Sequence, residues 1–433
     1  MRVVLFHEVW NNFSGGGAIY LLNLAKGLSE FKNVEVTVVL LLCEDKANEN
    51  FINEELTSLK SSFKLLRVDI SEYAIIRNPR KIIETIQREV AFANFDLAHH
   101  TDGGAWGILA GKEVNYKLSS LVTYHHLLPK AWTDYATQKN KCVARLVDRV
   151  LGVSKTVSNE LLRNYDIAEN KMVTVYNGLN DLDSYLSSIE LRNEYHIPKD
   201  DNIIGYIGRL EPEKNLFILL KAFKQLQEVW LVLIGDGSLK ESLYDYCDKN
   251  KIEKVLFLGF RKNARNYLKM LNVLCLPSFS EACPFVLVES MIAEVPVVGS
   301  NRSGIKELLH NGDYGLLFDP ESVEDLATKL RTILKDSENS QKMLNLARSF
   351  SLREFSCKSM VNNTLKVYND AILEKKNPKL SGKNIAECLR TEYQRFFSNI
   401  QGLPKYMIIL LKLRYRIECL IWTGKLQFFG LRR

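Results

Sequence analysis

The sequence predicts an α/β protein with two doubly wound domains and a basic helical tail. Strand-length apolar runs alternate with helix-length segments over most of the chain. The length of 433 residues suits two domains, because single cores stop growing at roughly 250 to 300 residues. The composition, 46% apolar and 25% charged, is that of a globular protein and excludes a disordered or fibrous class.

The first set of strands is expected before residue 155, in "RVVLF", "VEVTVVLLL", "FDLAHH", "SSLVTYHH" and "RVLGVS". The second set follows residue 201, in "NIIGYIGRL", "VWLVLIGDG", "VLFLGF", "VLCLPS" and "VPVVGS". Continuous runs of Val, Ile and Leu indicate parallel sheets that are covered on both faces. Ligands of such sheets bind beyond the carboxyl ends of the strands, and a cleft between two domains commonly holds them.

We place the N-terminal domain at residues 1–180 and the C-terminal domain at residues 181–355, with a polar linker region over 177–201. A crossover helix is expected at 356–373, and residues 374–433 form the tail. From Lys375 onward the chain has 13 Lys and Arg against 3 Glu, a balance of +10, so the rest of the +7 chain has a net charge of −3.

The tail segment "KYMIILLKLRYRIECLIW" (405–422) is apolar, but charges at 412, 414, 416 and 418 make it a poor transmembrane span. Two interpretations are open. The segment forms an interfacial helix that is attracted to anionic lipid, or it forms a helix that packs on the body of the protein.

The eight cysteines are scattered without a CxxC pair, so neither a zinc site nor a disulfide framework is indicated. The N-terminal "MRVVLFHEVW" enters a strand-like run directly and has no secretion-signal pattern. We therefore expect a cytoplasmic protein, with peripheral attachment to the cytoplasmic membrane face if the tail is interfacial.

A glycine run follows the first strand, and Gly15, Gly16 and Gly17 open a helix in "SGGGAIYLLNLAKGL". Glycines let a backbone approach a ligand closely, and a helix N-terminus offers unpaired N–H groups. The run is not GxGxxG, and no GxxxxGK[ST] occurs in the chain, which disfavours dinucleotide and Walker-type sites. An ordinary strand-to-helix turn is the alternative.

Two cations follow the first strand of the second half, where "IGRLEPEKN" contains Arg209 and Lys214. Arg offers a planar fork of donors and Lys a point charge, so the pair suits a diphosphate. A solvated surface pair is the alternative.

Two glutamates stand eight positions apart in "SEACPFVLVESMIAEVPVV". Glu281 is expected in a turn and Glu289 about one turn into a helix, whose first N–H groups, at Phe285 and Val286, point to the same space. A carboxylate can accept two hydrogen bonds from a vicinal diol, so one glutamate suits a ribose and the other a sugar ring. Stabilisation of a helix dipole is the alternative, and it explains Glu281 better than Glu289.

In this order the motifs resemble the GT-B nucleotide-sugar glycosyltransferases, specifically glycosyltransferase family 4 (glycosyl transferases group 1). The resemblance covers about residues 1–373 and also rests on "VSKTVSNEL", "VYNGLN", "LVLIGDGSLKESL" and "YGLLFDPESVEDLA". It implies two Rossmann-like domains that face each other across a cleft and bind a nucleotide-diphosphate sugar. The matching Arg209 and Lys214 would hold the donor diphosphate, helped by Gly16 and Gly17 of the glycine-rich loop.

The resemblance also implies roles for three further side chains. Glu289 would bind the ribose, and Glu281 would lie near the transferred sugar. His125, in "TYHH", looks like the family's histidine beside the reacting sugar, although His126 fills a slot where the family often has Asp and the assignment shifts by one if it is the match. A structural histidine at a strand end is the alternative. Family members often have Gly-Phe-Gly after the first glutamate, whereas this chain has "ACP".

The family's reaction is a transfer that retains anomeric configuration, without metal or cofactor, to a hydroxyl of a glycan or glycolipid. Arg209 and Lys214 would neutralise the leaving diphosphate while the acceptor attacks from the same face, so catalysis is mainly electrostatic and positional. A double displacement needs a nucleophile, for which only Glu281 offers itself, and it is not favoured. The rival functions are a sugar-nucleotide epimerase and an inactive binding protein. The donor's base and sugar are not set by these residues.

One motif points elsewhere, because Asp181 to Asp183 spell the DxD that binds metal in another glycosyltransferase fold. The motif falls in the linker rather than in a compact site. We therefore predict no metal site there.

Overall fold

The structure is a computed structural model that describes residues 1–9, 16–43, 63–72, 79–101, 106–115, 118–125, 143–144, 146–165, 167–179, 188–335 and 337–374. The predicted DxD motif at Asp181–Asp183, Gly15, His126 and the tail from Lys375 onward lie outside these residues.

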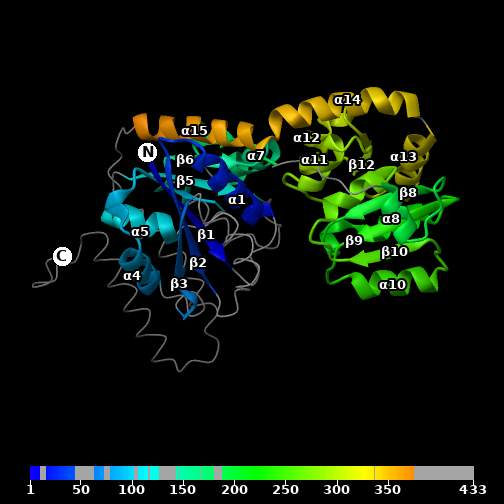
Figure 1. Cartoon of the computed structure of the whole chain (residues 1–433), viewed down its shortest axis with the longest axis horizontal. Coiled ribbons are helices and arrows are strands. Elements are labelled where there is room, and N and C mark those ends of the chain that lie inside the picture. The colour runs from blue at the N-terminus through cyan, green and yellow to red at the C-terminus, as the bar shows by residue number, and fades with distance from the viewer. Residues whose placement is uncertain are drawn as a thin grey trace, which may run out of the picture. The chain divides into compact units, whose positions relative to one another are not determined.

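The chain forms two compact units. In Figure 1 most of the first unit is blue to cyan, apart from its last helix, which is orange, and most of the second is green to yellow. Among the described residues, unit 1 comprises those of Met1–Val153 and Val157–Val175 and those from Val361 to Glu374. Unit 2 comprises Ser154–Thr156 and Tyr176–Met360. Each unit has its own sheet and its own core, so each is described separately.

Unit 1 is built on a seven-stranded parallel sheet of order β3-β2-β1-β4-β5-β6-β7. Its elements are β1 (Arg2–Val9), α1 (Gly16–Ser29), β2 (Glu35–Leu42), β3 (Lys64–Asp69), α4 (Pro79–Glu89), η1 (Phe92–Asn94), β4 (Leu97–His100), α5 (Trp106–Val114), β5 (Ser119–Tyr124), β6 (Arg149–Gly152), α7 (Lys155–Asn164), η3 (Glu169–Lys171) and β7 (Met172–Thr174). The strand order reverses between β1 and β4. The carboxyl ends of these strands are the usual ligand position in such sheets.

Unit 2 is built on a six-stranded parallel sheet of order β10-β9-β8-β11-β12-β13. Its elements are α8 (Ser188–Glu194), β8 (Asn202–Ile207), η4 (Pro212–Lys214), α9 (Leu216–Phe223), β9 (Val229–Ile234), α10 (Lys240–Lys249), β10 (Val255–Gly259), η5 (Ala264–Met270), β11 (Val273–Leu276), α11 (Phe285–Ile292), β12 (Val297–Ser300), α12 (Ser303–Leu308), η6 (His310–Gly312), β13 (Leu316–Phe318), α13 (Val323–Lys335) and α14 (Ser337–Glu354). Here the order reverses between β8 and β11.

The central strands are buried on both faces, as their continuous apolar sequences predict. In β1 the buried apolar run is Val3–Phe6, and His7 after it is also buried, whereas in β11 all four residues, Val273–Leu276, are buried and apolar. Helices cover such sheets on both sides, which leaves the strand ends as the accessible edges. The prediction of two doubly wound α/β domains is confirmed.

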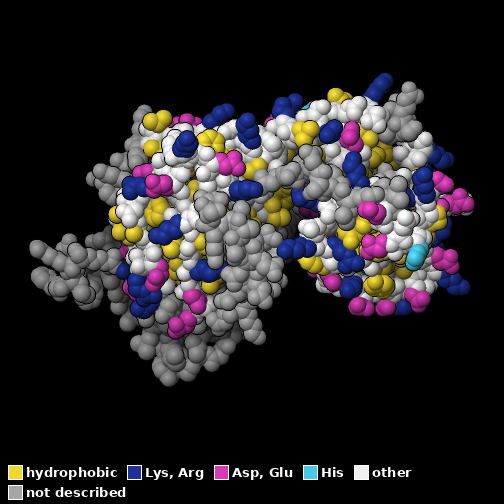
Figure 2. Space-filling model, in the orientation of Figure 1, with side chains coloured by type: hydrophobic (Ala, Val, Ile, Leu, Met, Phe, Trp, Pro, Cys, Tyr) yellow, Lys and Arg dark blue, Asp and Glu magenta, His cyan; other side chains and the backbone are white. Residues whose placement is uncertain are grey.

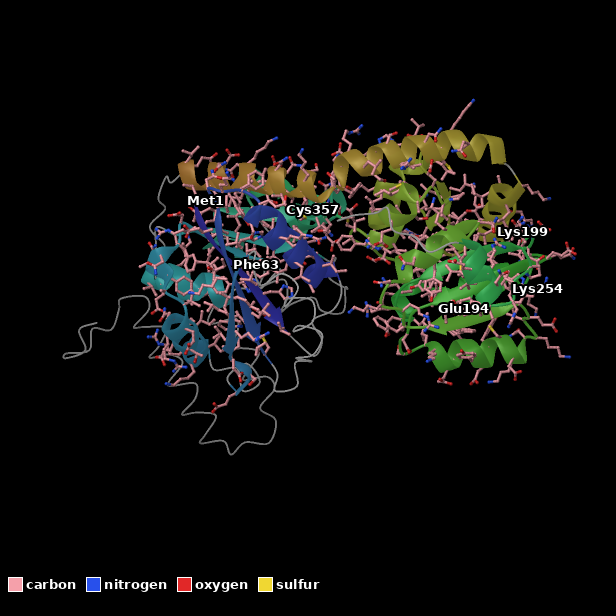
Figure 3. The ribbon with its side chains drawn as sticks, in the orientation of Figure 1. Met1, Phe63, Glu194, Lys199, Lys254 and Cys357 are labelled. Atoms are coloured by element: carbon pink, nitrogen blue, oxygen red, sulfur yellow. The ribbon has the colours of Figure 1, made fainter. Side chains whose placement is uncertain are left out.

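Helix α15 (Cys357–Leu373) occupies the range expected for the crossover helix, and its start at Cys357 is labelled in Figure 3. Residues up to Met360 belong to unit 2 and those from Val361 to unit 1. In unit 1, the Tyr368 hydroxyl lies 2.7 Å from His99 Nδ1, and Ser119 Oγ donates to Ala371 O at 3.3 Å. The last part of the described chain therefore completes the unit that the first part begins.

On the face that Figure 2 shows, Lys and Arg are interspersed with Asp and Glu. Among the helices that the structure describes, none combines the length and apolar character that a membrane crossing requires.

Candidate active site

Strands β8 and β11 are neighbours in the sheet of unit 2, and their carboxyl ends bring two predicted motifs together. Lys214 ends η4, whereas Glu281 lies in the turn before α11. The backbone N–H of Phe279 donates to Glu213 O at 2.9 Å and ties the two loops. Lys214 and Glu281 therefore meet although they lie 67 positions apart in the sequence.

Lys214 and Glu281 form a shielded ion pair. Lys214 Nζ donates to Glu281 Oε1 at 2.7 Å, and the two side chains are only 14% and 17% exposed. The Ser278 hydroxyl donates to the same oxygen at 2.8 Å. Charge-assisted hydrogen bonds at such distances are stronger than neutral ones, so this carboxylate has a defined position.

The second predicted cation, Arg209, has a fixed backbone and an exposed side chain. The buried Tyr206 donates its hydroxyl proton to Arg209 O at 2.7 Å. The Arg209 guanidinium pairs with Glu213 at 2.9 Å, and these side chains are 70% and 44% exposed. Exposed pairs of this kind contribute little stability, so this guanidinium can exchange its partner for a ligand at small cost.

Helix α11 begins at Phe285, after Pro284 in an extended conformation, as the sequence predicts. The N–H groups of Phe285 and Val286 belong to its first turn, where no preceding helical carbonyl can accept them. Glu289 follows one turn later. Burial raises the pKa of the Glu289 carboxyl to about 7, partly offset by the positive charge of Arg265.

The loops after β8 and β9 are locked together beneath these residues. Gly235 has φ +142°, and a Cβ at this position would lie only 1.9 Å from Gly208 O. Only glycine, which has no Cβ, can therefore occupy this position. The Glu211 carboxylate accepts hydrogen bonds from Ser238 N at 3.1 Å and Ser238 Oγ at 2.6 Å. This interlock gives Arg209 and Lys214 a rigid base.

In unit 1, His125 follows β5 at the carboxyl edge of the sheet. Its Nε2 donates to Thr101 O at 2.6 Å, so Nε2 carries a proton. The ring of Tyr20, from α1, packs edge-on with ring centroids 4.5 Å apart. Gly16 and Gly17 begin the same helix. The Thr101 carbonyl and the Tyr20 ring therefore both help to hold His125 in place.

A buried polar network lies behind His125. His99 Nε2 and Thr123 Oγ1 are 2.7 Å apart, and the Tyr20 hydroxyl lies 3.3 Å from the same Thr123 oxygen. Burial lowers the pKa of His99 to about 3, so its imidazole is neutral at physiological pH. Because a neutral imidazole donates through one nitrogen and accepts through the other, His99 can satisfy the Thr123 hydroxyl at Nε2 and the Tyr368 hydroxyl at Nδ1.

Two family models match the chain over ranges that hold these two sets of residues. The model described as Glycosyltransferase Family 4 matches residues 14–181, and that described as Glycosyl transferases group 1 matches residues 187–350. The chain belongs to glycosyltransferase family 4. The resemblance inferred from the ordered motifs is thereby confirmed.

Relatives of this glycosyltransferase differ in how much of their length they share with it. An uncharacterized glycosyltransferase of Methanocaldococcus jannaschii is 26% identical over 378 residues, which cover 85% of this chain and 98% of the relative. The N-acetylgalactosamine-N,N'-diacetylbacillosaminyl-diphospho-undecaprenol 4-alpha-N-acetylgalactosaminyltransferase of Campylobacter jejuni is 30% identical over 205 residues, which cover 47% of this chain and 55% of the relative. The second match thus spans about half of that relative.

Solved structures share the fold of this glycosyltransferase. Anabaena HepE in complex with UDP and glucose matches with a TM-score of 0.70 at 18% identity, covering 84% of this chain and 99% of HepE. The sucrose-phosphate synthase of Thermosynechococcus elongatus matches with a TM-score of 0.71 at 18% identity, covering 86% and 99%. At this identity the likeness concerns the fold, and the GT-B class predicted from the sequence is confirmed.

The structure distributes the predicted site residues of the glycosyltransferase between its units. Unit 2 holds Arg209, Lys214, Glu281, Phe285, Val286 and Glu289, and unit 1 holds Gly16, Gly17 and His125. Sequence reasoning missed the hydroxyl partners Ser278 and Tyr206 and the ring of Tyr20. In the described part of the chain, no group of three or more His, Cys, Asp or Glu is placed to hold a metal ion.

Proposed function

We propose that this glycosyltransferase moves a sugar from a nucleotide-diphosphate sugar to a hydroxyl of a glycan or lipid-linked acceptor, with retention of configuration and without a metal. The contact between Lys214 and Glu281 carries the proposal. In a nucleotide sugar the diphosphate is directly joined to the transferred sugar. A cation for the diphosphate beside a carboxylate for the sugar matches that order.

In the proposed mechanism Arg209 and Lys214 hold the diphosphate and neutralise the charge that develops as the glycosidic bond breaks. Glu289 accepts hydrogen bonds from the ribose diol, and the first N–H groups of α11 face the phosphate. Glu281 stays beside the sugar ring. The acceptor hydroxyl attacks from the face that the diphosphate leaves, and positioning supplies much of the rate.

Both proposed diphosphate ligands already have carboxylate partners, Glu213 for Arg209 and Glu281 for Lys214. Donor binding therefore exchanges or shares ion-pair partners rather than filling empty donors. The ammonium of Lys214 has three N–H donors, so it can keep Glu281 and contact a phosphate oxygen as well.

Two features support the finer parts of the proposal. The name of the Campylobacter relative contains "alpha" for the bond that it makes and "diphospho-undecaprenol" for its acceptor. Transfer from an α-linked donor to an α product is a retention, and a diphospho-polyprenol is a lipid-linked acceptor. For metal independence, the support is that two cations and a helix N-terminus can bind a diphosphate by themselves.

The proposed function is tested by incubating the full chain with UDP-, GDP- and ADP-sugars in EDTA, together with glycan and polyprenyl-diphosphate glycan acceptors. Transfer of one sugar with retained anomeric configuration, read by NMR of the product, is the expected result. Epimerised donor without acceptor would establish the epimerase, and binding without hydrolysis or transfer would establish the inactive binding protein. Loss of transfer in EDTA would overturn metal independence.

We further propose that the protein acts in the cytoplasm and that its basic tail provides any attachment to the membrane. The tail carries +10 against −3 for the rest of the chain, and attraction to anionic lipid weakens with salt. In a flotation assay at low salt, the full chain should therefore rise with anionic liposomes, whereas a chain ending at Leu373 should remain in the unbound fraction. Equal flotation of both would contradict the proposal, and failure of the shortened chain to fold would favour the tail that packs on the body.

A further inference from the structure

A fully buried serine, Ser278, contacts the Lys214–Glu281 pair. It follows β11, and its hydroxyl donates to Glu281 Oε1 at 2.8 Å. Lys214 Nζ donates to the same oxygen at 2.7 Å. One carboxylate oxygen thus accepts a neutral donor from its own loop and a charged donor from the neighbouring loop.

The backbone of Ser278 is itself held by the next strand. Ser300, at the end of β12, is also fully buried, and its hydroxyl donates to Ser278 O at 2.6 Å. Strands β11 and β12 are paired in the sheet. The serine is therefore anchored on the sheet while its own hydroxyl proton is directed at Glu281.

Another buried serine of unit 2 shows the more usual arrangement. Ser290 Oγ donates to the backbone carbonyl of Val295 at 2.9 Å, which is a local contact within the turn that ends α11. Ser278 instead donates to a carboxylate. A hydrogen bond to a charged acceptor is roughly twice as strong as one to a neutral acceptor, so the Ser278 hydroxyl restrains Glu281 rather than its own backbone.

We propose that Ser278 is a positioning residue for the transfer, which holds the Glu281 carboxylate in place when Lys214 turns toward the donor diphosphate. The expected effect of Ser278 on turnover rests on the proposed function, whereas its hydrogen bond to Glu281 does not. Ser278 is fully buried, so it acts through Glu281 and does not touch the donor itself. Without it, Glu281 would depend on Lys214, the same cation that the diphosphate attracts.

The contact is tested first without any donor, by urea unfolding of the full chain. Ser278→Ala should lower the unfolding midpoint of the otherwise native chain. In a Glu281→Ala background the same substitution should leave the midpoint unchanged or raise it, because the hydroxyl would then be buried without its acceptor. Ser290→Ala is the matched control and should lower the midpoint equally in both backgrounds. An equal loss for Ser278→Ala in both backgrounds would overturn the proposal.

The effect of Ser278 on turnover is tested next. The donor is the one that the native chain turns over fastest among UDP-glucose, UDP-N-acetylgalactosamine, GDP-mannose and ADP-glucose. Ser278→Ala should lower kcat by about tenfold or more, the usual effect of losing a hydrogen bond to a charged group, and change the donor KM far less. Ser278→Thr keeps a hydroxyl and should recover part of kcat. Ser290→Ala should keep kcat, since neighbouring helix positions do not face each other.

These outcomes separate the proposal from the proposed function. If the native chain turns over no donor while the unfolding measurements show coupling of Ser278 to Glu281, the proposed function fails and the positioning contact stands. If turnover is normal but Ser278→Ala behaves like Ser290→Ala, the proposed function stands and the positioning role is wrong.

Discussion

In unit 2 the predicted site side chains Arg209, Lys214 and Glu281 are charged and form ion pairs, whereas the predicted side chain of unit 1, His125, contacts a backbone carbonyl and an aromatic ring. In unit 2, Lys214 meets Glu281 at 2.7 Å. In unit 1, His125 donates to Thr101 O, and burial keeps His99 neutral. Under the proposed function, the charged side chains of unit 2 would bind the diphosphate, and His125 of unit 1 would orient a sugar hydroxyl. Ligand binding by the charged side chains of unit 2 should depend on salt and pH, whereas the contribution of His125 should not depend on salt.

Lys214→Ala should have the largest effect, because it removes a cation from the diphosphate and leaves the partly buried Glu281 without its ion pair. Nucleoside diphosphate affinity should fall by about ten- to a hundredfold, which corresponds to roughly 1.5 to 3 kcal/mol. Calorimetry with UDP, GDP and ADP measures the change.

Lys254→Ala is the control for Lys214→Ala. Lys254 pairs with Asp201 but precedes β10, at the amino edge of the same sheet, and it is labelled in Figure 3. The control should bind nucleotide like the native chain. Equal affinity of both variants would contradict the charged character of the site.

Nucleotide affinity should rise as pH increases through about 7, the pKa of Glu289. A ribose diol donates its protons, so the ionised carboxylate is the form that binds. Below pH 7 the protonated form dominates, and affinity should fall by up to about tenfold per pH unit. Calorimetry from pH 5.5 to 8.5 measures the slope, with corrections for nucleotide titration.

Glu289→Gln should remove this pH dependence, because an amide does not titrate in this range. It should also weaken binding at pH 8, where the native carboxylate is ionised. A pH slope that persists in Glu289→Gln would assign the titration to another group and move the ribose contact away from Glu289.

His125→Ala should have a smaller effect, in turnover rather than in donor affinity. Loss of one hydrogen-bonding imidazole costs about 0.5 to 1.5 kcal/mol, so kcat should fall roughly three- to tenfold. The size of this loss should be the same at low and high salt, unlike that of Lys214→Ala. His310→Ala, at an exposed pair with Asp313, serves as the control. A salt-dependent loss in His125→Ala would mean that unit 1 also binds charge.

Glu213→Gln should have the smallest effect. Its pair with Arg209 is exposed, so the free energy of unfolding should change by less than about 0.5 kcal/mol. Nucleotide affinity should rise slightly, because Arg209 loses a competing carboxylate. Weaker binding would show instead that Glu213 holds the guanidinium in a productive position.

Much of this architecture could be predicted from local sequence. Apolar runs such as Val3–Phe6 identify the strands. Because the strands are parallel, the loops that follow them lie at the same edge of the sheet. The start of α11 at Phe285 could be predicted because Pro284 and the apolar run after it mark a helix boundary. Lys214 and Glu281 could be assigned to one site because the ordered motifs that contain them resemble those of the glycosyltransferase family.

The supporting contacts could not be predicted, because they depend on conformation rather than pattern. Ser278 stands three positions before Glu281, but only the folded turn directs its hydroxyl at the carboxylate. Likewise His99 meets Tyr368 across 269 positions of sequence, a contact that no local rule specifies. Serine and tyrosine are common residues, and their roles here follow from one hydrogen bond each.

The discontinuity of unit 1 has a consequence for biosynthesis. Its sheet is translated first, but Tyr368 and Ala371, which contact β4 and β5, are translated only after the sequence of unit 2. At roughly 5 to 20 residues per second, the ribosome needs about 10 to 40 s to pass from residue 175 to residue 373. During that interval unit 1 lacks its closing helix, while the sequence of unit 2 is being completed. We therefore expect the nascent chain to need chaperone protection at the surface that α15 later covers, and the second unit to finish folding before the first.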